Sequence, residues 1–262
     1  MRSLDQSAKI AESAVRMAGD LLENSRPQVV TAKADRDTFT DIDVLIERKI
    51  RSYLADATPD IAFLGEEEGY SNQVTDSGYT WVLDPVDGTA NFVHGVPLSA
   101  VSLALVNDNT AVVGVISLPR LHLTYTAVQG GGAYVNGQPI SVSGVTELSG
   151  AMVAIGDYAT GTGAEEKNTR RIALTTALAG RVERIRMFGS AAHDLVWLAE
   201  GRVDAALILA NEPWDVAAGV LIAREAGALV VDASGATHDS QSADTIAATP
   251  AIVDQLLAII PA

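Results

Sequence analysis

Acidic residues gather in three short segments of the chain, and each segment also contains glycine. They read GEEEG at 65–69, DPVDGT at 84–89 and WDVAAG at 214–219. Taken singly, the three are typical of a solvated loop, a β-turn and a charge at a helix start. Each one, however, follows directly on an apolar strand or loop, and sites on α/β scaffolds are built at such element ends. Together they indicate one site assembled from three parts of the chain.

The residue types in these segments favour Mg²⁺. Carboxylates and a backbone carbonyl, with no histidine or cysteine in the motifs, are ligands for a hard cation, whereas zinc prefers nitrogen or sulfur. Pro85 fixes φ, so the turn can aim Asp84 and Asp87 at one point with the Val86 carbonyl between them. Two Mg²⁺ ions held about 4 Å apart by such carboxylates are the arrangement used for phosphoryl displacement by water. The motif chemistry therefore predicts a metal-dependent phosphoryl transfer.

The segment WVLDPVDGTANFVHG at 81–95, with GEE at 65–67 and WDVAAG at 214–219, resembles the inositol monophosphatase family of Mg²⁺-dependent, lithium-sensitive sugar phosphatases. The resemblance covers nearly the whole chain. It implies a phosphoric monoester hydrolase with the layered α-β-α-β-α sugar-phosphatase fold of the α+β class. The first sheet would be mixed and largely antiparallel, and the second half α/β. The implied substrate is a small phosphorylated alcohol, with myo-inositol 1-phosphate as the leading candidate.

The resemblance also implies roles for individual residues and two or three Mg²⁺ ions per site. The implied metal ligands are Glu66, Asp84, Val86 through its carbonyl, Asp87, Asp215 and, for a weakly held third ion or its waters, Glu67. Thr89, together with Glu66 or Asp43, would orient and deprotonate the attacking water, and Asp43 would pair with Thr89. The implied substrate-binding residues are Asp87, Gly88, Thr89, Ala90, Gly189, Ser190, Ala191 and Asp215.

One position departs from the family pattern. Many members carry a substrate-contacting glutamate seven residues before the WD aspartate, and this chain has Ile208 there. An aliphatic side chain cannot accept hydrogen bonds from a polyol, so the departure puts inositol in doubt but not the phosphatase chemistry. Histidinol phosphate, fructose 1,6-bisphosphate and 3′-phosphoadenosine 5′-phosphate are the alternative substrates. A catalytically silent scaffold that binds a partner is the alternative of another class.

The elements around the three segments follow from hydrophobic periodicity. A helix is expected over 4–22 and a second one from Thr40 or Asp41, with extended chain or a hairpin over 27–40. Apolar runs at 61–64 and 81–84 predict strands that end on the acidic segments. Runs at 99–106, 111–118 and 122–128 predict a β-meander, and Asn136-Gly137 a type I′ turn.

The second half of the chain alternates strands and helices. Strands are expected at 152–155, 184–187, 203–209, 228–231 and 244–248, and helices at 165–179, 190–200, 214–226 and 250–260. The last helix would have Thr249 as its N-cap and Pro250 at its first position. We expect two halves in a single compact unit: an α+β half over 1–145 with most metal ligands, and an α/β half over 146–262 with the WD aspartate and the substrate-lining segment.

Composition limits the partners. The chain has 18 Lys and Arg against 33 Asp and Glu, a net charge of −15. Such an acidic chain is poorly suited to nucleic acid or to anionic membranes. It has no cysteine, which excludes disulfides and thiolate metal sites. No apolar run suits a membrane span or a signal peptide, so we expect a cytoplasmic location, and the resemblance implies a homodimer.

Overall fold

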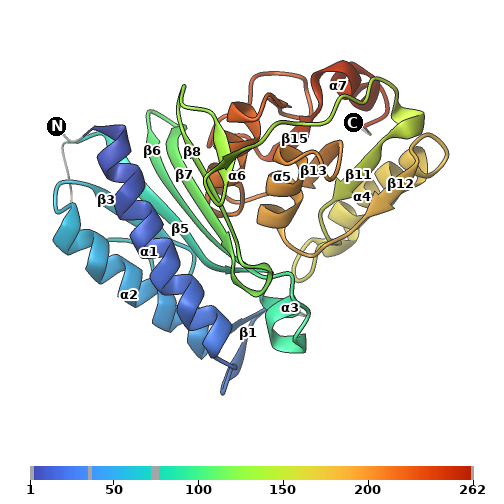
Figure 1. Cartoon of the computed structure of the whole chain (residues 1–262). Helices are drawn as coiled ribbons and strands as arrows, with labels where there is room; N and C mark the ends of the chain where they lie inside the picture. Colours follow the sequence, from blue (N-terminus) through green and yellow to red (C-terminus); the bar gives the residue numbers. More distant parts are fainter. Residues whose placement is uncertain (1–2, 35–36, 72–76, 261–262) are drawn as a thin grey trace.

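The computed structural model describes residues 3–34, 37–71 and 77–260. Five layers follow one another in the order helices, sheet, helices, sheet, helices (Figure 1). This is the α-β-α-β-α arrangement that the resemblance implied, and the fold expectation is confirmed.

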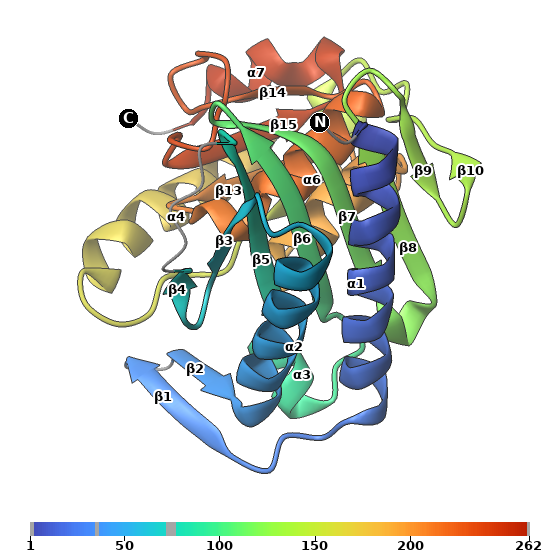
Figure 2. The ribbon, with the colours of Figure 1, turned by 90° about the vertical axis from the view of Figure 1, so that its left-hand side faces the viewer.

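Two long helices form the first layer. These are α1 (Leu4–Asn24) and α2 (Asp41–Ala57), and both lie on one face of the first sheet (Figure 2). Each begins with a capping box, Ser3 with Gln6 and Thr40 with Asp43, because these side chains satisfy amides that lack helical partners. Thr40 is thus the N-cap of the second helix.

The first sheet has eight strands in the order β10-β9-β8-β7-β6-β5-β3-β4. The strands are β3 (Ala62–Gly65), β4 (Gly69–Tyr70), β5 (Tyr79–Asp87), β6 (Ala100–Asn107), β7 (Thr110–Leu118), β8 (Leu123–Val128), β9 (Ala133–Val135) and β10 (Gln138–Pro139). All neighbours are antiparallel except β3 and β5. The predicted meander is confirmed in β6–β8. So is the tight turn, where Asn136 and Gly137 have φ of 49° and 76°.

A separate hairpin precedes α2. It pairs β1 (Val30–Ala34) with β2 (Asp37–Thr40), which confirms the expected hairpin, although residues 35–36 of its turn lie outside the described residues. The hairpin lies beside α2 and apart from the main sheets (Figure 2).

The second sheet has five strands in the order β12-β11-β13-β15-β14. They are β11 (Met152–Ile155), β12 (Arg184–Arg186), β13 (Ala205–Leu209), β14 (Leu229–Val231) and β15 (Asp244–Ala248). Strand β11 runs parallel to β12 and β13, whereas β15 is antiparallel to β13 and β14. The alternating strands expected here are confirmed with boundaries shifted by one or two residues.

Helices cover both faces of this second sheet. The middle layer holds α5 (Ala191–Ala199) and α6 (Pro213–Glu225), whose buried residues pack against both sheets. The outer layer holds α4 (Ala164–Ala179) and α7 (Val253–Leu257). Single turns of 3₁₀-helix occur at Pro119–Leu121, Leu148–Gly150 and Pro250–Ile252.

The single helix expected over 250–260 is wrong. Residues Pro250–Ile252 form a 3₁₀ turn and the α-helix begins only at Val253. Thr249 is the N-cap residue of the 3₁₀ turn and Pro250 follows it, as expected. The Thr249 hydroxyl makes no capping hydrogen bond and lies 3.1 Å from that of Ser143.

Within the described residues, none of the helices combines the length and hydropathy needed to cross a membrane.

Candidate active site

The second acidic segment lies where β5 leaves its regular pairing with β6. The register shifts between Asp84 and Asp87, because Pro85 has no amide hydrogen to donate to the sheet. Asp84 is 2% exposed and accepts a hydrogen bond of 3.0 Å from the Val86 amide. The irregularity therefore turns both aspartates toward the same end of the strand.

Gly88 connects this segment to the short helix α3 (Thr89–His94). Its φ is 82°, and a Cβ there would lie 2.8 Å from the Leu98 carbonyl oxygen and 3.1 Å from that of Gly189. Only glycine accepts both the left-handed backbone and the close approach. The same backbone contact brings the DGT turn against the predicted substrate-lining segment of the second half.

Asp87 lies at the N-terminus of α5. Its carboxylate accepts hydrogen bonds from the Ala192 amide at 2.7 Å, from the Ala191 amide at 3.3 Å and from the Ser190 hydroxyl. Burial raises the pKa of Asp87 to about 6, although these donors oppose the shift. Ser190 is buried, and its hydroxyl oxygen accepts a hydrogen bond from the His193 amide. It is therefore the N-cap of α5 as well as a donor to Asp87.

Thr89 and Asp43, predicted to pair, do so in the structure. The Thr89 hydroxyl lies 3.2 Å from Asp43 Oδ1 and 3.0 Å from the Val86 carbonyl oxygen. The other oxygen of Asp43 accepts from the Thr40 hydroxyl and amide, as part of the α2 capping box. Burial raises the pKa of Asp43, against the Thr40 hydrogen bonds. The start of α2 thus fixes the carboxylate that faces Thr89.

The GEE segment lies on a turn between β3 and β4 that a buried side chain supports. Glu47 of α2 accepts the amides of Glu67 at 2.8 Å and Glu68 at 3.0 Å, and it pairs with Arg51 at 2.7 Å. A Cβ at Gly65 would overlap the Glu47 carboxylate. The motif glycine therefore leaves room for the group that holds the acidic turn.

A lysine from the β1–β2 hairpin reaches the same turn. Lys33 Nζ lies 2.7 Å from a carboxylate oxygen of both Glu66 and Glu67. Burial raises the pKa of Glu67 to about 7, although the hydrogen bond from Lys33 acts in the opposite direction. The hairpin thus places a positive charge directly on the predicted metal-ligating acids.

Asp215 stands in the first turn of α6, which Pro213 begins. The Glu212 amide donates to Asp215 Oδ2 at 2.8 Å, and the Asp215 amide donates back to the Glu212 carbonyl at 3.2 Å. Burial raises the pKa of Asp215 to about 7, and the charges of Asp87 and Glu66 add to the shift. Glu212 thereby orients the aspartate from the residue before the helix.

Repulsion among carboxylates links the three segments. Burial, and then the charges of Glu66, Asp87 and Asp215, raise the pKa of Asp84 well above its usual value. Over the described ranges, no three acidic or histidine side chains meet around one point as the ligands of one ion do. Each carboxylate instead accepts from a protein donor: Lys33 for Glu66, the Val86 amide for Asp84, the α5 amides for Asp87 and the Glu212 amide for Asp215. The donor set is nonetheless all oxygen, strongly anionic and largely buried, which fits a hard divalent cation.

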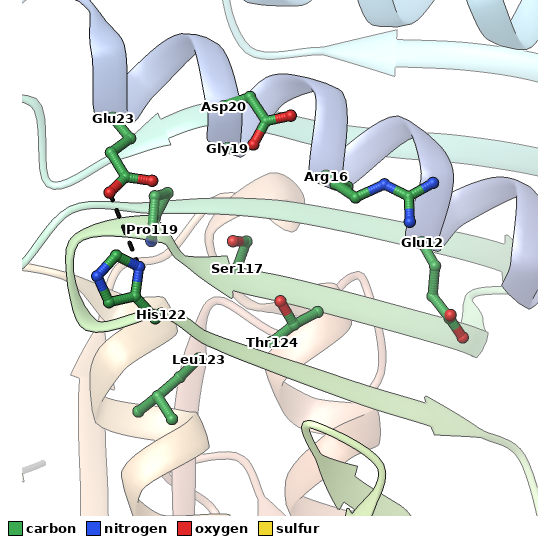
Figure 3. A pocket seen from close by; sticks show the side chains of 10 residues that line it. All are labelled: Glu12, Arg16, Gly19, Asp20, Glu23, Ser117, Pro119, His122, Leu123 and Thr124. Carbon is green, nitrogen blue, oxygen red and sulfur yellow. Dashed lines mark ion pairs between the residues drawn. The ribbon is translucent and has the colours of Figure 1, made fainter.

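An open cleft of about 840 Å³ joins the first and third segments. Its lining includes Lys33, Glu66, Glu67, Trp214 and Asp215. A second hollow of about 290 Å³ lies between α1 and the β7–β8 connection, where His122 is 3.7 Å from Glu23 (Figure 3). None of the predicted site residues lines this hollow, so the cleft at the acidic segments is the candidate site.

Sequence reasoning missed three supporting residues. Lys33 and Glu47 carry no local motif, and only the fold brings them to the GEE turn. Asn91, inside the recognised motif, donates its amide to the carbonyls of Leu98 at 2.8 Å and Phe188 at 2.7 Å. Asn91 lies between Gly88 and Gly95 in the sequence, and this position could have indicated a side chain that joins two backbone segments.

Comparisons with known proteins identify the family. A family model described as "Inositol monophosphatase family" matches residues 3–261. The chain belongs to the inositol monophosphatase family. Members of this family are phosphoric monoester hydrolases, and so is this protein.

Similar proteins span nearly the whole chain. An "Inositol monophosphatase" of Dictyostelium discoideum is 36% identical over 97% of this chain and 94% of its own. A "Nus factor SuhB" of Pasteurella multocida is 36% identical over 95% of this chain and 93% of its own. The solved structure of Thermotoga maritima IMPase superposes with a TM-score of 0.86 at 32% identity, covering 98% of this chain and 96% of that one.

The family position of the substrate-contacting glutamate is occupied by a core residue here. Ile208 is 7% exposed and belongs to an apolar cluster with Leu195, Leu198 and Val216. Ala90 is the second residue of α3, and Ala191 is the first residue of α5 and donates its amide to Asp87. The structure thus brings the predicted site residues of both halves together, while leaving no acid at position 208.

Proposed function

We propose that this protein is a Mg²⁺-dependent phosphomonoesterase that hydrolyses a small phosphorylated alcohol. The observation that carries the proposal is that Glu66 and three aspartates are close enough for their charges to interact. Burial raises the pKa of Asp84, Asp87 and Asp215, and the charge of Glu66 adds to each of these shifts. Buried like charges are costly unless a cation compensates them. An acid-rich site of this kind is suited to attract a phosphate only through bound metal.

The metal ligands in this proposal are the residues expected from the motifs. Glu66, Asp84, Asp87, Asp215 and the Val86 carbonyl would hold two ions, with Glu67 near a third. When bound, Mg²⁺ would offset the carboxylate charge, attract the phosphate and increase the acidity of a water molecule. Lys33 would compete with a cation for Glu66, whereas the hydrogen bonds to Asp87 and Asp215 leave lone pairs on both carboxylates.

Thr89 and Asp43 would direct the attacking water. The Thr89 hydroxyl has one proton and two acceptors within reach, Asp43 Oδ1 and the Val86 carbonyl. If the carbonyl serves as a metal ligand, the proton goes to Asp43. The Thr89 oxygen then keeps a lone pair that can accept a hydrogen bond from the attacking water. The water proton would go either to Thr89 as Thr89 passes its own proton to Asp43, or directly to Glu66.

The phosphate would lie against the start of α3. The first amides of a helix lack carbonyl partners within the helix, so those of Gly88, Thr89 and Ala90 can donate to phosphate oxygens. The alcohol portion would lie toward Gly189, Ser190 and Ala191. Since Ser190 already donates to Asp87, we assign it the orientation of that carboxylate rather than a direct hydrogen bond to the alcohol.

We propose myo-inositol 1-phosphate as the leading substrate, because similar proteins are named inositol monophosphatase or probable inositol 1-monophosphatase. A panel should include histidinol phosphate, fructose 1,6-bisphosphate and 3′-phosphoadenosine 5′-phosphate, with inorganic phosphate release as the readout. The highest kcat/KM for inositol 1-phosphate supports the proposal, and turnover of another panel member in its place would reassign the substrate.

A partner-binding role is the second candidate, because similar proteins are named Nus factors. Absence of phosphate release from every panel member in saturating Mg²⁺ would favour that role.

We also propose that the protein is a homodimer located in the cytoplasm. Gel filtration with light scattering would test the dimer, and cell fractionation would test the location.

A further inference from the structure

The loop that connects β13 to α6 has an unusual backbone. Ala210 has a φ of 60°, in the left-handed region that non-glycine residues other than Asn and Asp rarely enter. Asn211 and Glu212 follow, and Glu212 donates its amide to Asp215. The conformation of three residues therefore determines where the Asp215 carboxylate points.

Neighbouring segments hold this loop from outside. The Ala210 amide donates to Asp244 Oδ1 at 3.0 Å, and Arg170 donates to the other oxygen of Asp244 at 2.8 Å. The Asn211 amide donates to the Ala243 carbonyl at 3.0 Å. A strained conformation persists only where its surroundings fix it, and here β15 and the residues before it do so.

A hydrogen-bond network of three side chains completes the support. Asn211 Nδ2 donates to the Ser242 carbonyl at 3.2 Å, which leaves Oδ1 as the acceptor for the Thr245 hydroxyl at 2.9 Å. The Thr245 oxygen lies 2.8 Å from His238 Nε2. Since the threonine proton goes to Asn211, His238 must carry its proton on Nε2 and donate to Thr245.

Burial makes this hydrogen-bond network sensitive to the loss of one atom. Thr245 is fully buried and His238 is 4% exposed. Removal of the Thr245 hydroxyl would leave both Asn211 Oδ1 and His238 Nε2–H without that partner. Two unpaired groups could regain partners only if the loop or the ring moved.

We infer that Asn211, held by Thr245 and His238, is a positioning residue that sets the Asp215 carboxylate for metal binding. This inference rests on the proposed function, because it takes Asp215 as a Mg²⁺ ligand. Asn211 itself touches neither metal nor substrate; it acts through Glu212 and the first turn of α6.

The test is a Mg²⁺ titration of the metal-free full-length protein, followed by tryptophan fluorescence and by calorimetry. Thr245→Val removes the hydroxyl and should weaken Mg²⁺ binding roughly 10-fold, the lower end of the effect of groups that orient metal ligands. Thr245→Ser keeps the hydroxyl and should restore the affinity to within about twofold of the wild type.

A matched control is available in the other half of the chain. Thr58 is also fully buried, and its hydroxyl donates to the Leu54 carbonyl and accepts from Trp81 Nε1 at 3.0 Å. Thr58→Val should lower the melting temperature without changing the affinity for Mg²⁺. Should Thr245→Val fail to fold, Asn211→Ala, at a partly exposed position, replaces it and should weaken Mg²⁺ binding similarly.

The outcomes separate the inference from the proposed function. Weaker Mg²⁺ binding by Thr245→Val but not by Thr58→Val supports the inference. Unchanged Mg²⁺ affinity with a lower melting temperature in both variants would overturn it and leave the proposed function intact. A wild type that binds no Mg²⁺ would overturn the proposed function, and the inference with it.

Discussion

The side chain of Thr89 shows how one atom can link structure to chemistry. Its hydroxyl lies within reach of both Asp43 and the Val86 carbonyl, so it connects the α2 cap to the acidic turn of β5. The family resemblance implied this threonine and its partner. It could not show that the same aspartate also caps α2 through Thr40, because that role depends on where the helix begins.

Thr89→Ala should reduce kcat about 100-fold and change KM little, because the hydroxyl orients the water rather than the substrate. Thr89→Ser keeps the hydroxyl and should retain most of the turnover. Steady-state kinetics at saturating Mg²⁺ measures both. Equal losses in the two variants would mean that the methyl group, not the hydroxyl, is the feature that matters.

At the scale of elements, the β3–β4 turn is held by Glu47, a residue that no sequence motif indicates. Glu47 of α2 holds the turn amides, and Gly65 leaves the space that it fills. The acidic motif was visible in the sequence. Its support was not, because Glu47 lies in an ordinary helical pattern and meets the turn only after the layers pack.

Gly65→Ala should destabilise the protein by about 1–3 kcal/mol, because the new methyl group overlaps a buried carboxylate. It should also weaken Mg²⁺ binding by displacing Glu66. Gly180→Ala is the control, since a Cβ there meets no atom within 4 Å. Chemical denaturation and a Mg²⁺ titration give the two readouts, and unchanged values in Gly65→Ala would contradict this account of the turn.

The β1–β2 hairpin adds a charge that competes with the metal. Lys33→Gln removes the ammonium group from Glu66 and Glu67, so Mg²⁺ should bind about two- to fivefold more tightly, the range expected for a partly exposed ion pair. Calorimetry with Mg²⁺ measures the change. Weaker binding by Lys33→Gln would show that the lysine assists the metal site instead.

At the scale of the whole molecule, the two halves meet at the site. Asn91 of the first half bonds the Phe188 carbonyl, and Asp87 bonds the first amides of α5. We therefore propose that the halves 1–145 and 146–262 act as a single compact unit. Alternation and periodicity predicted most strands and helices, and the family resemblance implied the layers. The final helix was predicted too long, because its first turn is a 3₁₀ turn and the α-helix ends at Leu257.

Stability should depend on pH in a defined direction. Burial raises the pKa of Asp87 to about 6 and that of Asp215 to about 7, so the folded state binds more protons than the unfolded state above pH 4. In chelator, the melting temperature should therefore fall as pH rises from about 4 to 7. The stabilisation by Mg²⁺ should grow over the same window, because the metal and protons compete for these carboxylates.

Thermal melts with and without Mg²⁺ across this window provide the measurement. Asp215→Asn should flatten the decline seen in chelator, whereas Asp56→Asn, at an exposed position near the end of α2, should not. A decline of the same steepness in Asp215→Asn would mean that another group is responsible.

We propose that the acidic segments form one Mg²⁺ site for hydrolysis of a phosphomonoester. Release of inorganic phosphate from myo-inositol 1-phosphate, measured with Mg²⁺, with chelator and with Asp215→Asn, tests it most directly. Turnover should require Mg²⁺ and should fall at least about 100-fold in the variant. Full turnover by Asp215→Asn, or by the wild type in chelator, would contradict it.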